Sequence, residues 1–217
     1  MISNRRGKGN ETRKILFKDI YRIRGWKDGT LDTIYDIGAN LGIFAVMMRF
    51  RHPKARVIAV EPSLECLLYL RSNLDFLDIH LEEVAMGNGD PLYLKSRGHI
   101  LDDMFVEEPN GYMVQTMTLG DLYKKYGGKK YMLKFNCEGG EKYLIGDKAS
   151  EDVVRNSSYS MFQIHYQSVD TPFSNWLPES AYETWFNETF GETHVITKYK
   201  MGNKLGTVQF ILYPKKR

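Results

Sequence analysis

The sequence predicts an α/β domain in which helices cover both faces of a central, mostly parallel β-sheet. The first observation is that short apolar runs alternate with helix-like segments along residues 33 to 85, a pattern typical of strand–helix–strand units with right-handed crossovers. The second is the composition, because 42% hydrophobic and 26% charged residues in a chain of 217 are ordinary for one globular domain. No repeat or long linker divides the chain, so residues 1–217 are expected to form a single domain.

Strands and helices alternate in the first part of the chain. The apolar run Thr33-Ile-Tyr-Asp-Ile ends at a glycine, which predicts a buried strand that leads into a tight turn. Residues 41–50 and 63–74 have the pattern of helices, and the nearly continuous apolar run 56–61 between them predicts a second strand. Residues 79–85 alternate loosely and complete the series as a third strand.

Residues 86–118 interrupt this pattern. They contain the turn sequence Gly87-Asn-Gly-Asp-Pro and a short Leu92-Tyr-Leu run, which predict an insertion with short antiparallel strands. The parallel pattern resumes with a helix over 119–126, a strand over 131–137, a short helix over 141–146 and a strand over 160–166. The last part predicts a helix over 181–190 and an antiparallel C-terminal hairpin made of the runs 194–201 and 207–213.

Charge is distributed unevenly along the chain. Residues 1 to 27 hold nine Lys and Arg against two acids, a net charge of +7, whereas the whole chain carries only +3. Such a segment could grip phosphates or an acidic surface. Alternatively its charges form the solvated face of a packing helix, because Ile15, Leu16, Ile20 and Ile23 recur at near-helical spacing after Thr12. We expect residues 1–29 to form this basic helical segment.

Several classes of protein are excluded at this stage. No apolar run approaches the roughly 18 residues that a membrane span needs. The first residues lack the apolar core of a signal peptide, and two cysteines cannot form a disulfide framework, so a cytoplasmic, reducing location is expected. Neither cysteine has a second ligand at zinc spacing, so no zinc site is expected.

The turn from Asp36 to Gly42 lies between the first predicted strand and the first predicted helix. In a doubly wound sheet a ligand binds beyond the carboxyl end of such a strand, and glycines let the backbone approach it. Glu61 ends the second predicted strand, where an acid can bind both hydroxyls of a ribose. A plain structural turn is the alternative, and Glu61 argues against it.

The composition of the turn distinguishes between nucleotide cofactors. A dinucleotide site favours G-x-G-x-x-G, which seats a pyrophosphate on the helix N-terminus. Here Asn40 replaces the middle glycine, and Asp36 places a negative charge beside the turn. A carboxylate there would repel a pyrophosphate but attract an ammonium or a sulfonium. We therefore expect S-adenosyl-L-methionine as the ligand.

Four segments, taken in order, resemble the FkbM-type methyltransferase family: Asp36-Ile-Gly-Ala-Asn-Leu-Gly, Val60-Glu-Pro-Ser, Val84-Ala-Met-Gly and Leu133-Lys-Phe-Asn-Cys-Glu-Gly-Gly-Glu. The resemblance covers roughly residues 30 to 166. It implies a Rossmann-like class I methyltransferase fold and methyl transfer from S-adenosylmethionine to hydroxyls of polyketides and sugars. Asn136 departs from the family, which usually has an aspartate at this position.

The resemblance also implies the parts of the cofactor that each segment would contact. The turn would line the methionine end, Glu61 would bind the ribose, and the turn from Glu83 to Met86 would hold the adenine. The full set of expected cofactor-binding residues is Asp36, Gly38, Ala39, Asn40, Gly42, Glu61, Pro62, Glu83, Ala85, Met86 and Asn136.

Methyl transfer to an alcohol requires a group that removes the hydroxyl proton. Because parallel strands direct their carboxyl ends to one crevice, Asn136, Glu138, Glu141 and His165 are expected to converge there. His165 and Glu138 compete as the base, and Lys134 would steady Glu138 or the cofactor. Structural roles for both are the alternative: a satisfied strand-end histidine, and a glutamate that favours a helix dipole. Asp102 and Asp103, in the insertion near the acceptor, are further candidates for the base.

A divalent cation could activate the hydroxyl instead. Asn136 removes the carboxylate that such a site would prefer, so no metal is predicted, although Glu138, Glu141 or the two aspartates could still hold one. Tyr166, Phe173 and Trp176 are candidates for one wall of the acceptor pocket, because aromatic faces suit a carbohydrate.

The sequence therefore predicts an S-adenosylmethionine-dependent O-methyltransferase that acts on a sugar hydroxyl of a glycan, such as a deoxyhexose. The carbohydrate acceptor rests on the family resemblance. The first alternative is a nucleic-acid methyltransferase that uses the basic segment, but the chain lacks a base-stacking Asp/Asn-Pro-Pro-aromatic motif, so no nucleic-acid partner is expected. The second is a non-catalytic module that binds S-adenosylmethionine.

Overall fold

The structure is a computed structural model, and it describes residues 21, 31–95, 104–106, 111–166, 176–200 and 207–216. The predicted basic segment 1–29 lies outside these residues except for Tyr21, and so do Asp102 and Asp103. Among the described residues no helix is long and apolar enough to cross a membrane.

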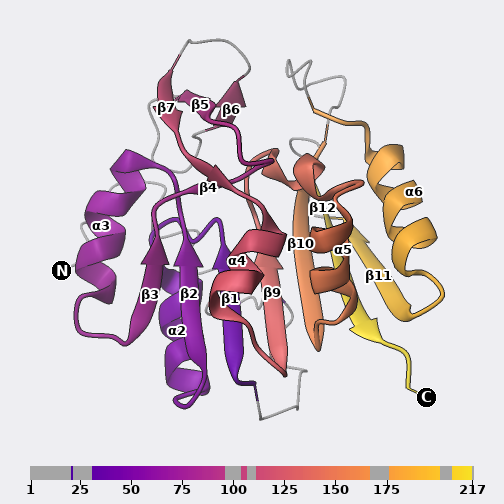
Figure 1. The fold of residues 1–217 in the computed structure, drawn as a ribbon, viewed down its shortest axis with the longest axis horizontal. Helices are drawn as coiled ribbons and strands as arrows, with labels where there is room; N and C mark the ends of the chain where they lie inside the picture. Colours follow the sequence, from indigo (N-terminus) through magenta and orange to yellow (C-terminus); the bar gives the residue numbers. More distant parts are fainter. Residues whose placement is uncertain are drawn as a thin grey trace.

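A seven-stranded sheet forms the centre of the molecule (Figure 1). Its strands are β1 (Thr33–Ile37), β2 (Arg56–Val60), β3 (Ile79–Glu82), β9 (Tyr131–Phe135), β10 (Tyr159–His165), β11 (His194–Lys200) and β12 (Thr207–Pro214). The spatial order is β11-β12-β10-β9-β1-β2-β3, and β12 is antiparallel to both of its neighbours. The sheet is otherwise parallel, and the direction of winding reverses between β1 and β9. This is where an open α/β sheet forms its ligand crevice.

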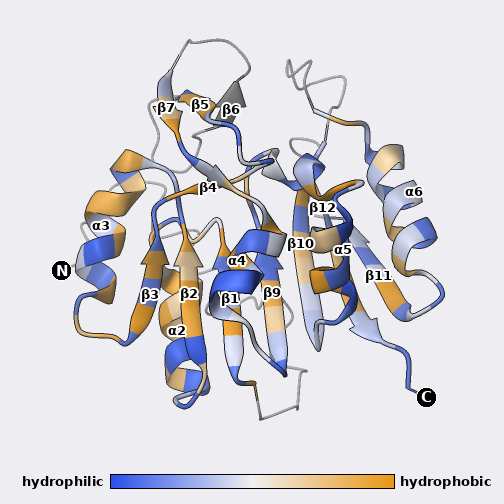
Figure 2. Ribbon diagram, in the orientation of Figure 1, coloured by the Kyte–Doolittle hydropathy of each residue, from blue (hydrophilic) through white to orange (hydrophobic). Residues whose placement is uncertain are grey.

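Helices cover both faces of the sheet, as predicted. The first face packs against α2 (Ile43–Arg51) and α3 (Leu64–Leu74), and the second against α4 (Leu119–Tyr126), α5 (Lys148–Arg155) and α6 (Glu179–Phe190). All five residues of β1 and of β9 are buried, which explains why these strands are nearly continuous apolar runs. In Figure 2 hydrophobic colours predominate along β2, and hydrophilic colours predominate on α4.

The predicted insertion does contain short antiparallel strands, namely β5 (Leu92–Lys95), β6 (Met104–Val106) and β7 (Tyr112–Val114). They lie beyond the carboxyl ends of the parallel strands (Figure 1). The predicted strand 79–85 was too long, because β3 ends at Glu82 and Ala85–Met86 forms a separate strand, β4. This strand pairs with β8 (Thr116–Met117) and so closes the insertion at its base.

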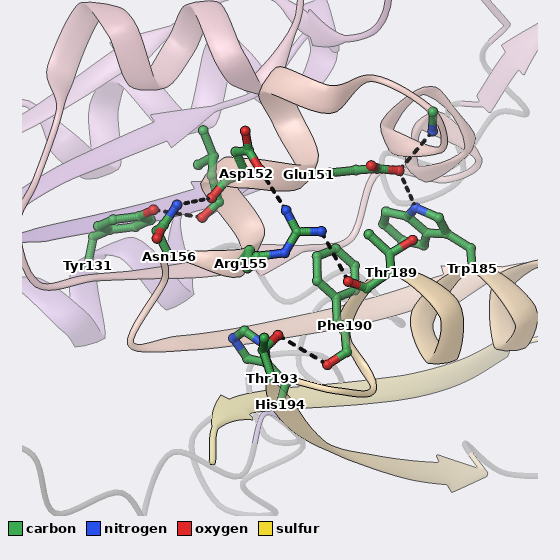
Figure 3. Close-up of polar contacts among 12 residues, drawn as sticks. Tyr131, Glu151, Asp152, Arg155, Asn156, Trp185, Thr189, Phe190, Thr193 and His194 are labelled. Atoms are coloured by element: carbon green, nitrogen blue, oxygen red, sulfur yellow. Dashed lines mark hydrogen bonds and ion pairs between the residues drawn. The ribbon is translucent and has the colours of Figure 1, made fainter. Parts of the chain in front are cut away.

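One helix, α5, was not predicted from the sequence. Only Ser150, Val153 and Val154 of its residues are buried, so the apolar signal is short. The helix is held to α6 by polar contacts that cross between the two (Figure 3). Two contacts reach α6: Glu151 accepts a hydrogen bond from the Trp185 indole at 2.8 Å, and Arg155 donates to Thr189 O. On the α5 side, Glu151 also accepts from Gly146 N, and Arg155 pairs with Asp152. The predicted short helix before it is a 3₁₀-helix, η1 (Gly140–Leu144).

Candidate active site

The turn after β1 requires its glycines for contacts inside the protein. Gly38 has φ +75°, and a Cβ atom there would lie 1.9 Å from the carbonyl oxygen of Asn136, at the end of β9. Gly42 also has a positive φ of 79°, and a Cβ atom there would lie 2.5 Å from the Leu70 side chain of α3. Both glycines thus allow close packing of the turn against β9 and α3. Their predicted role in the approach of a ligand stays a prediction.

Every backbone N–H of this turn already has an acceptor within the protein. Gly38 N and Ala39 N donate to Val60 O, Gly42 N donates to Ala39 O, and Leu41 N donates to the side chain of Asn40. Asn40 N donates to Glu61 Oε2 at 2.7 Å. A pyrophosphate-binding turn directs such N–H groups at the ligand. This turn offers none, so its hydrogen bonding disfavours a dinucleotide cofactor.

A buried ion pair lies beneath the turn. The Lys134 ammonium is 2.8 Å from Asp36 Oδ1, and both side chains are almost inaccessible. Asp36 Oδ2 also accepts a hydrogen bond from Ala45 N in α2, and Lys134 Nζ donates to Gly38 O at 2.6 Å. The pKa of Lys134 is raised even though burial opposes it, because Asp36 holds the charge in place.

This pair corrects two expectations from the sequence. Asp36 was expected to attract the positive charge of the cofactor, but its own charge is neutralised by Lys134 and it is fully buried. Lys134 was expected to steady Glu138 or the cofactor, and the structure instead ties it to Asp36 and to the turn. Both residues fix the backbone of the turn from below.

Glu61 has the position and the free capacity of a ligand-binding carboxylate. It follows the end of β2, and its two oxygens accept hydrogen bonds from Asn40 N and Ser63 N. A carboxylate has about four acceptor positions, so two remain after these contacts. Burial raises the pKa of Glu61 to about 7, although the two N–H donors and Lys134 oppose that rise.

The other expected cofactor residues differ in what they could offer to a ligand. Glu61 N donates to Glu82 O, so the segment that begins at Glu83 adjoins Glu61. Within that segment the Glu83 carboxylate forms a two-pronged ion pair with Arg71, and the side chains of Ala85 and Met86 are buried, so only their backbone could face a ligand. Pro62 is half-buried. The side-chain oxygen of Asn136 is buried and has no hydrogen-bond partner among the described residues.

Three of the expected acceptor-site residues come together at the ends of β9 and β10. His165 Nε2 lies 3.3 Å from Glu138 Oε1, and His165 Nδ1 lies 3.6 Å from Glu141 Oε1. Both oxygens of Glu141 accept backbone hydrogen bonds, from Cys137 N at 2.7 Å and from Gly139 N at 3.0 Å. The geometric argument from parallel strands therefore placed these side chains correctly.

The charge of His165 differs from the sequence prediction. Burial opposes the charged imidazolium, but the carboxylates of Glu138 and Glu141 outweigh it and raise the pKa of His165 to about 9. The sequence analysis assigned His165 its ordinary pKa near 6.5 and considered it as a base. The two carboxylates thus favour the protonated imidazolium, which has no free lone pair for a proton, and this counts against His165 as the base.

Aromatic side chains complete the surroundings of this cluster. The ring of Trp176 lies 5.8 Å from that of His165, and a Cβ atom on Gly139 would lie 2.5 Å from Trp176 Nε1. Tyr182, on α6, is fully buried, and its hydroxyl has no hydrogen-bond partner among the described residues. Sequence analysis counted Tyr182 only among the core aromatics. Its helical spacing with Trp185 and Phe186 predicts burial but not the presence of Glu141 nearby.

No group of three or more His, Cys, Asp or Glu side chains within the described ranges is placed to hold a metal ion. The nearest possible ligands, Glu138, Glu141 and His165, lie together at the ends of β9 and β10 but do not form such a group. The candidates in the insertion, Asp102 and Asp103, lie outside the described residues.

Comparisons with known proteins identify the fold. No protein-family model and no curated protein matches the sequence. Among solved structures, the methyltransferase FkbM from Methylobacillus flagellatus KT is 12% identical with a TM-score of 0.57, over 88% of this chain and 46% of that one. A candidate rRNA methylase from Clostridium thermocellum is 10% identical with a TM-score of 0.54, over 99% of both chains. The METTL16 methyltransferase domain is 12% identical with a TM-score of 0.54, over 91% of this chain and 65% of that one.

These similarities confirm the predicted fold class. The chain has the Rossmann-like fold of class I S-adenosylmethionine-dependent methyltransferases, with a mostly parallel seven-stranded sheet and an antiparallel C-terminal hairpin. The identities of 10% to 12% support a statement about the fold alone.

Proposed function

We propose that the protein is an S-adenosylmethionine-dependent O-methyltransferase that methylates a hydroxyl group of a carbohydrate. The observation that carries this proposal is the crevice at the reversal of the sheet. The Glu61 carboxylate follows the end of β2, and the Glu138–His165 pair lies at the ends of β9 and β10. We assign the cofactor and the acceptor to this shared edge of the sheet.

The residues of the crevice fit S-adenosylmethionine in three respects. The two remaining acceptor positions of Glu61 match the two hydroxyls of a ribose. The buried, unpartnered oxygen of Asn136 is suited to accept a hydrogen bond from an ammonium group such as that of the methionine part. The turn from Gly38 to Gly42 has no N–H left for a phosphate, and this cofactor carries none. When bound, it supplies a methyl group attached to a positively charged sulfur.

The acceptor is assigned from the chemistry of the second half of the crevice and from the resemblance to FkbM-type methyltransferases. A partly exposed carboxylate beside buried aromatic rings suits an uncharged molecule with hydroxyl groups. The cytoplasmic location and the absence of a metal requirement remain parts of this proposal.

A second candidate acceptor is RNA. The charge of +7 on residues 1 to 27 favours it, because basic segments bind phosphates with little need for a shaped surface. Two of the similar structures are a candidate rRNA methylase and the METTL16 methyltransferase domain. The crevice of this chain, however, has carboxylates where an RNA backbone would approach the transferred methyl group.

Calorimetry tests the cofactor assignment. Replacing Glu61 by Ala should weaken the binding of S-adenosylmethionine by about 1.5 to 3 kcal/mol, because hydrogen bonds to a charged acceptor are lost. Glu65→Ala is the matched control, since it removes an exposed acid from the first turn of α3 without changing the crevice. Unchanged affinity of Glu61→Ala, or tighter binding of a nicotinamide dinucleotide by the wild-type protein, would refute the assignment.

A labelled methyl donor tests the reaction. The protein is incubated with radioactive S-adenosylmethionine and separate pools of glycans and RNA, with and without a chelator. Label in the glycan pool that persists with chelator supports the proposal. Label in the RNA pool selects the second candidate, and loss of transfer with chelator shows that a metal activates the acceptor. Binding of cofactor without any transfer would identify a non-catalytic module.

A further inference from the structure

The backbone at Glu138 is held in an unusual conformation. Glu138 itself has φ +49°, a conformation that residues other than glycine rarely adopt, and Gly139 follows with φ +100°. Glu141 stabilises this turn by accepting hydrogen bonds from the backbone N–H groups on both sides of Glu138. Strained backbone that its surroundings hold in place is concentrated at functional sites. The turn therefore sets the direction in which the Glu138 side chain leaves the backbone.

The three ionisable groups of the cluster differ in their access to an acceptor. The His165 side chain is 7% exposed and that of Glu141 is fully buried, whereas that of Glu138 is 34% exposed. Trp176 packs against the imidazole ring, and Thr207 of β12 is the register partner of His165 in the sheet. Of the three, only Glu138 can touch a molecule that enters the crevice.

We propose that Glu138 is the catalytic residue that accepts the hydroxyl proton of the acceptor, and that His165 is a positioning residue whose imidazole ring, 3.3 Å from the Glu138 carboxylate, fixes it in place. This inference rests on the proposed methyl transfer and goes beyond it by assigning the proton transfer. Glu141 completes the arrangement, because it faces the other nitrogen of His165 and keeps the ring oriented.

The step balances with the groups present. The acceptor oxygen forms a bond to the methyl carbon, the bond between that carbon and sulfur breaks, and its electron pair stays on the sulfur. The hydroxyl proton passes to the carboxylate of Glu138 and then to solvent, which reaches this side chain. No oxidant or metal is required.

The charged groups around His165 determine the pH range in which it can hold the Glu138 carboxylate. Among the described residues, the titratable groups that face the cluster are Glu138 and Glu141 from the segment after β9, Cys137 beside Glu141, and Tyr182 from α6. Burial raises the pKa of the Cys137 thiol and of the Tyr182 hydroxyl, so both stay neutral. The cluster then carries two carboxylates and one imidazolium until His165 loses its proton at a pH of about 9. Above that pH the ionic part of the contact between His165 and Glu138 is lost, and Glu138 is held less firmly.

Single-turnover kinetics across pH test the two roles. Glu138→Gln should lower the rate of methyl transfer about 10² to 10⁴-fold with cofactor affinity nearly unchanged. The wild-type rate should fall above a pH of about 9, and His165→Gln should be slower at neutral pH and lack that fall. Glu65→Gln is the matched control, because it also replaces one carboxylate by an amide, and Glu65 lies exposed on the first turn of α3.

Proton NMR of the cofactor-free protein provides a readout that needs no acceptor. The His165 resonance, identified as the one missing in His165→Gln, should titrate at about 9 and move toward 6.5 in Glu138→Gln. Three results would overturn the inference while the proposed function stands. The first is a near-normal transfer rate of Glu138→Gln, and the second is an unchanged His165 titration in that variant. The third is a fall in rate at alkaline pH that persists in His165→Gln.

Failure of the proton-transfer assignment can be distinguished from failure of the proposed function. If the wild-type protein transfers no methyl group to any pool, the proposed function fails and the proton-transfer role fails with it. Since His165 is buried, folding of His165→Gln is checked by its cofactor affinity. If His165→Gln does not fold, Glu138→Gln alone tests the proton-transfer assignment, through its transfer rate and its His165 titration. The Glu138 side chain is partly exposed, so this substitution should be tolerated.

Discussion

The close approach of the β1 turn to the end of β9 gives the sharpest test of the described site. Gly38 has φ +75°, and an added Cβ would lie 1.9 Å from Asn136 O, a backbone atom that cannot rotate away. Replacing Gly38 by Ala must therefore push the turn away from β9. That displacement would strain the hydrogen bond from Asn136 N to Ile37 O and the one from Lys134 to Gly38 O.

Gly89 provides a matched control within the same chain. It also has a positive φ, +99°, but an added Cβ there meets no atom within 4 Å. Gly89→Ala should cost only the conformational penalty of about 1 to 2 kcal/mol. Gly38→Ala should add an overpacking cost of about 1 to 3 kcal/mol, for a total of about 2 to 5 kcal/mol. The difference between the two variants isolates the contact with β9.

Urea unfolding of both variants measures these costs. For a chain of this size each kcal/mol corresponds to about 2 to 4 °C in Tm, so a thermal scan should separate the variants as well. Gly38→Ala should also bind S-adenosylmethionine less tightly, because the displaced turn carries the N–H that contacts Glu61. Equal stabilities of the two variants would refute the close approach of the turn to β9.

Two further predictions concern the buried charges. Asp36→Asn should destabilise the fold by about 3 to 5 kcal/mol, because it leaves the Lys134 ammonium buried without a counter-charge. A combined Asp36→Asn, Lys134→Met variant should recover much of that loss in denaturant unfolding. If the two substitutions instead had independent, additive costs, the ion pair would be contradicted. The raised pKa of His165 adds on the order of 3 kcal/mol to the free energy of unfolding; this contribution is fully present below pH 6.5 and is lost as the pH rises to about 9. His165→Gln should remove this slope from a plot of unfolding free energy against pH, and a slope that survives would assign it to another group.

The sequence was sufficient for the parts of the fold that depend on local pattern. Helix α3 (Leu64–Leu74) begins within one residue of its predicted start, because Ser63 caps it with a side chain that accepts a hydrogen bond from Cys66 N. The convergence of Glu138, Glu141 and His165 followed from topology alone, since the ends of adjacent parallel strands meet at one edge. Both conclusions need only the order of the elements.

Contacts that depend on register could not be predicted in the same way. Asp36 and Lys134 are direct partners across β1 and β9, which are almost 100 residues apart in the chain. Their pairing cancels the charge on which the sequence argument for cofactor recognition relied. The charge of His165 was missed for a related reason, because its pKa depends on two carboxylates from another segment and an isolated histidine has no such neighbours.

The corrected charges lead to a different account of ligand selection in the crevice. Asp36 no longer repels a pyrophosphate, so the exclusion of dinucleotides falls to the turn itself, whose N–H groups all donate within the protein. The negative charge that a cationic methyl donor would meet comes instead from the cluster of Glu138, Glu141 and His165, which carries one net negative charge near neutrality. A charge of this sign attracts a sulfonium and opposes an acceptor with phosphates close to the reacting hydroxyl. The same cluster that we propose to orient the proton acceptor would therefore favour an uncharged acceptor. A Glu138→Gln variant, which lacks one of the negative charges, should bind RNA more tightly than the wild-type protein, and unchanged RNA binding would contradict this account.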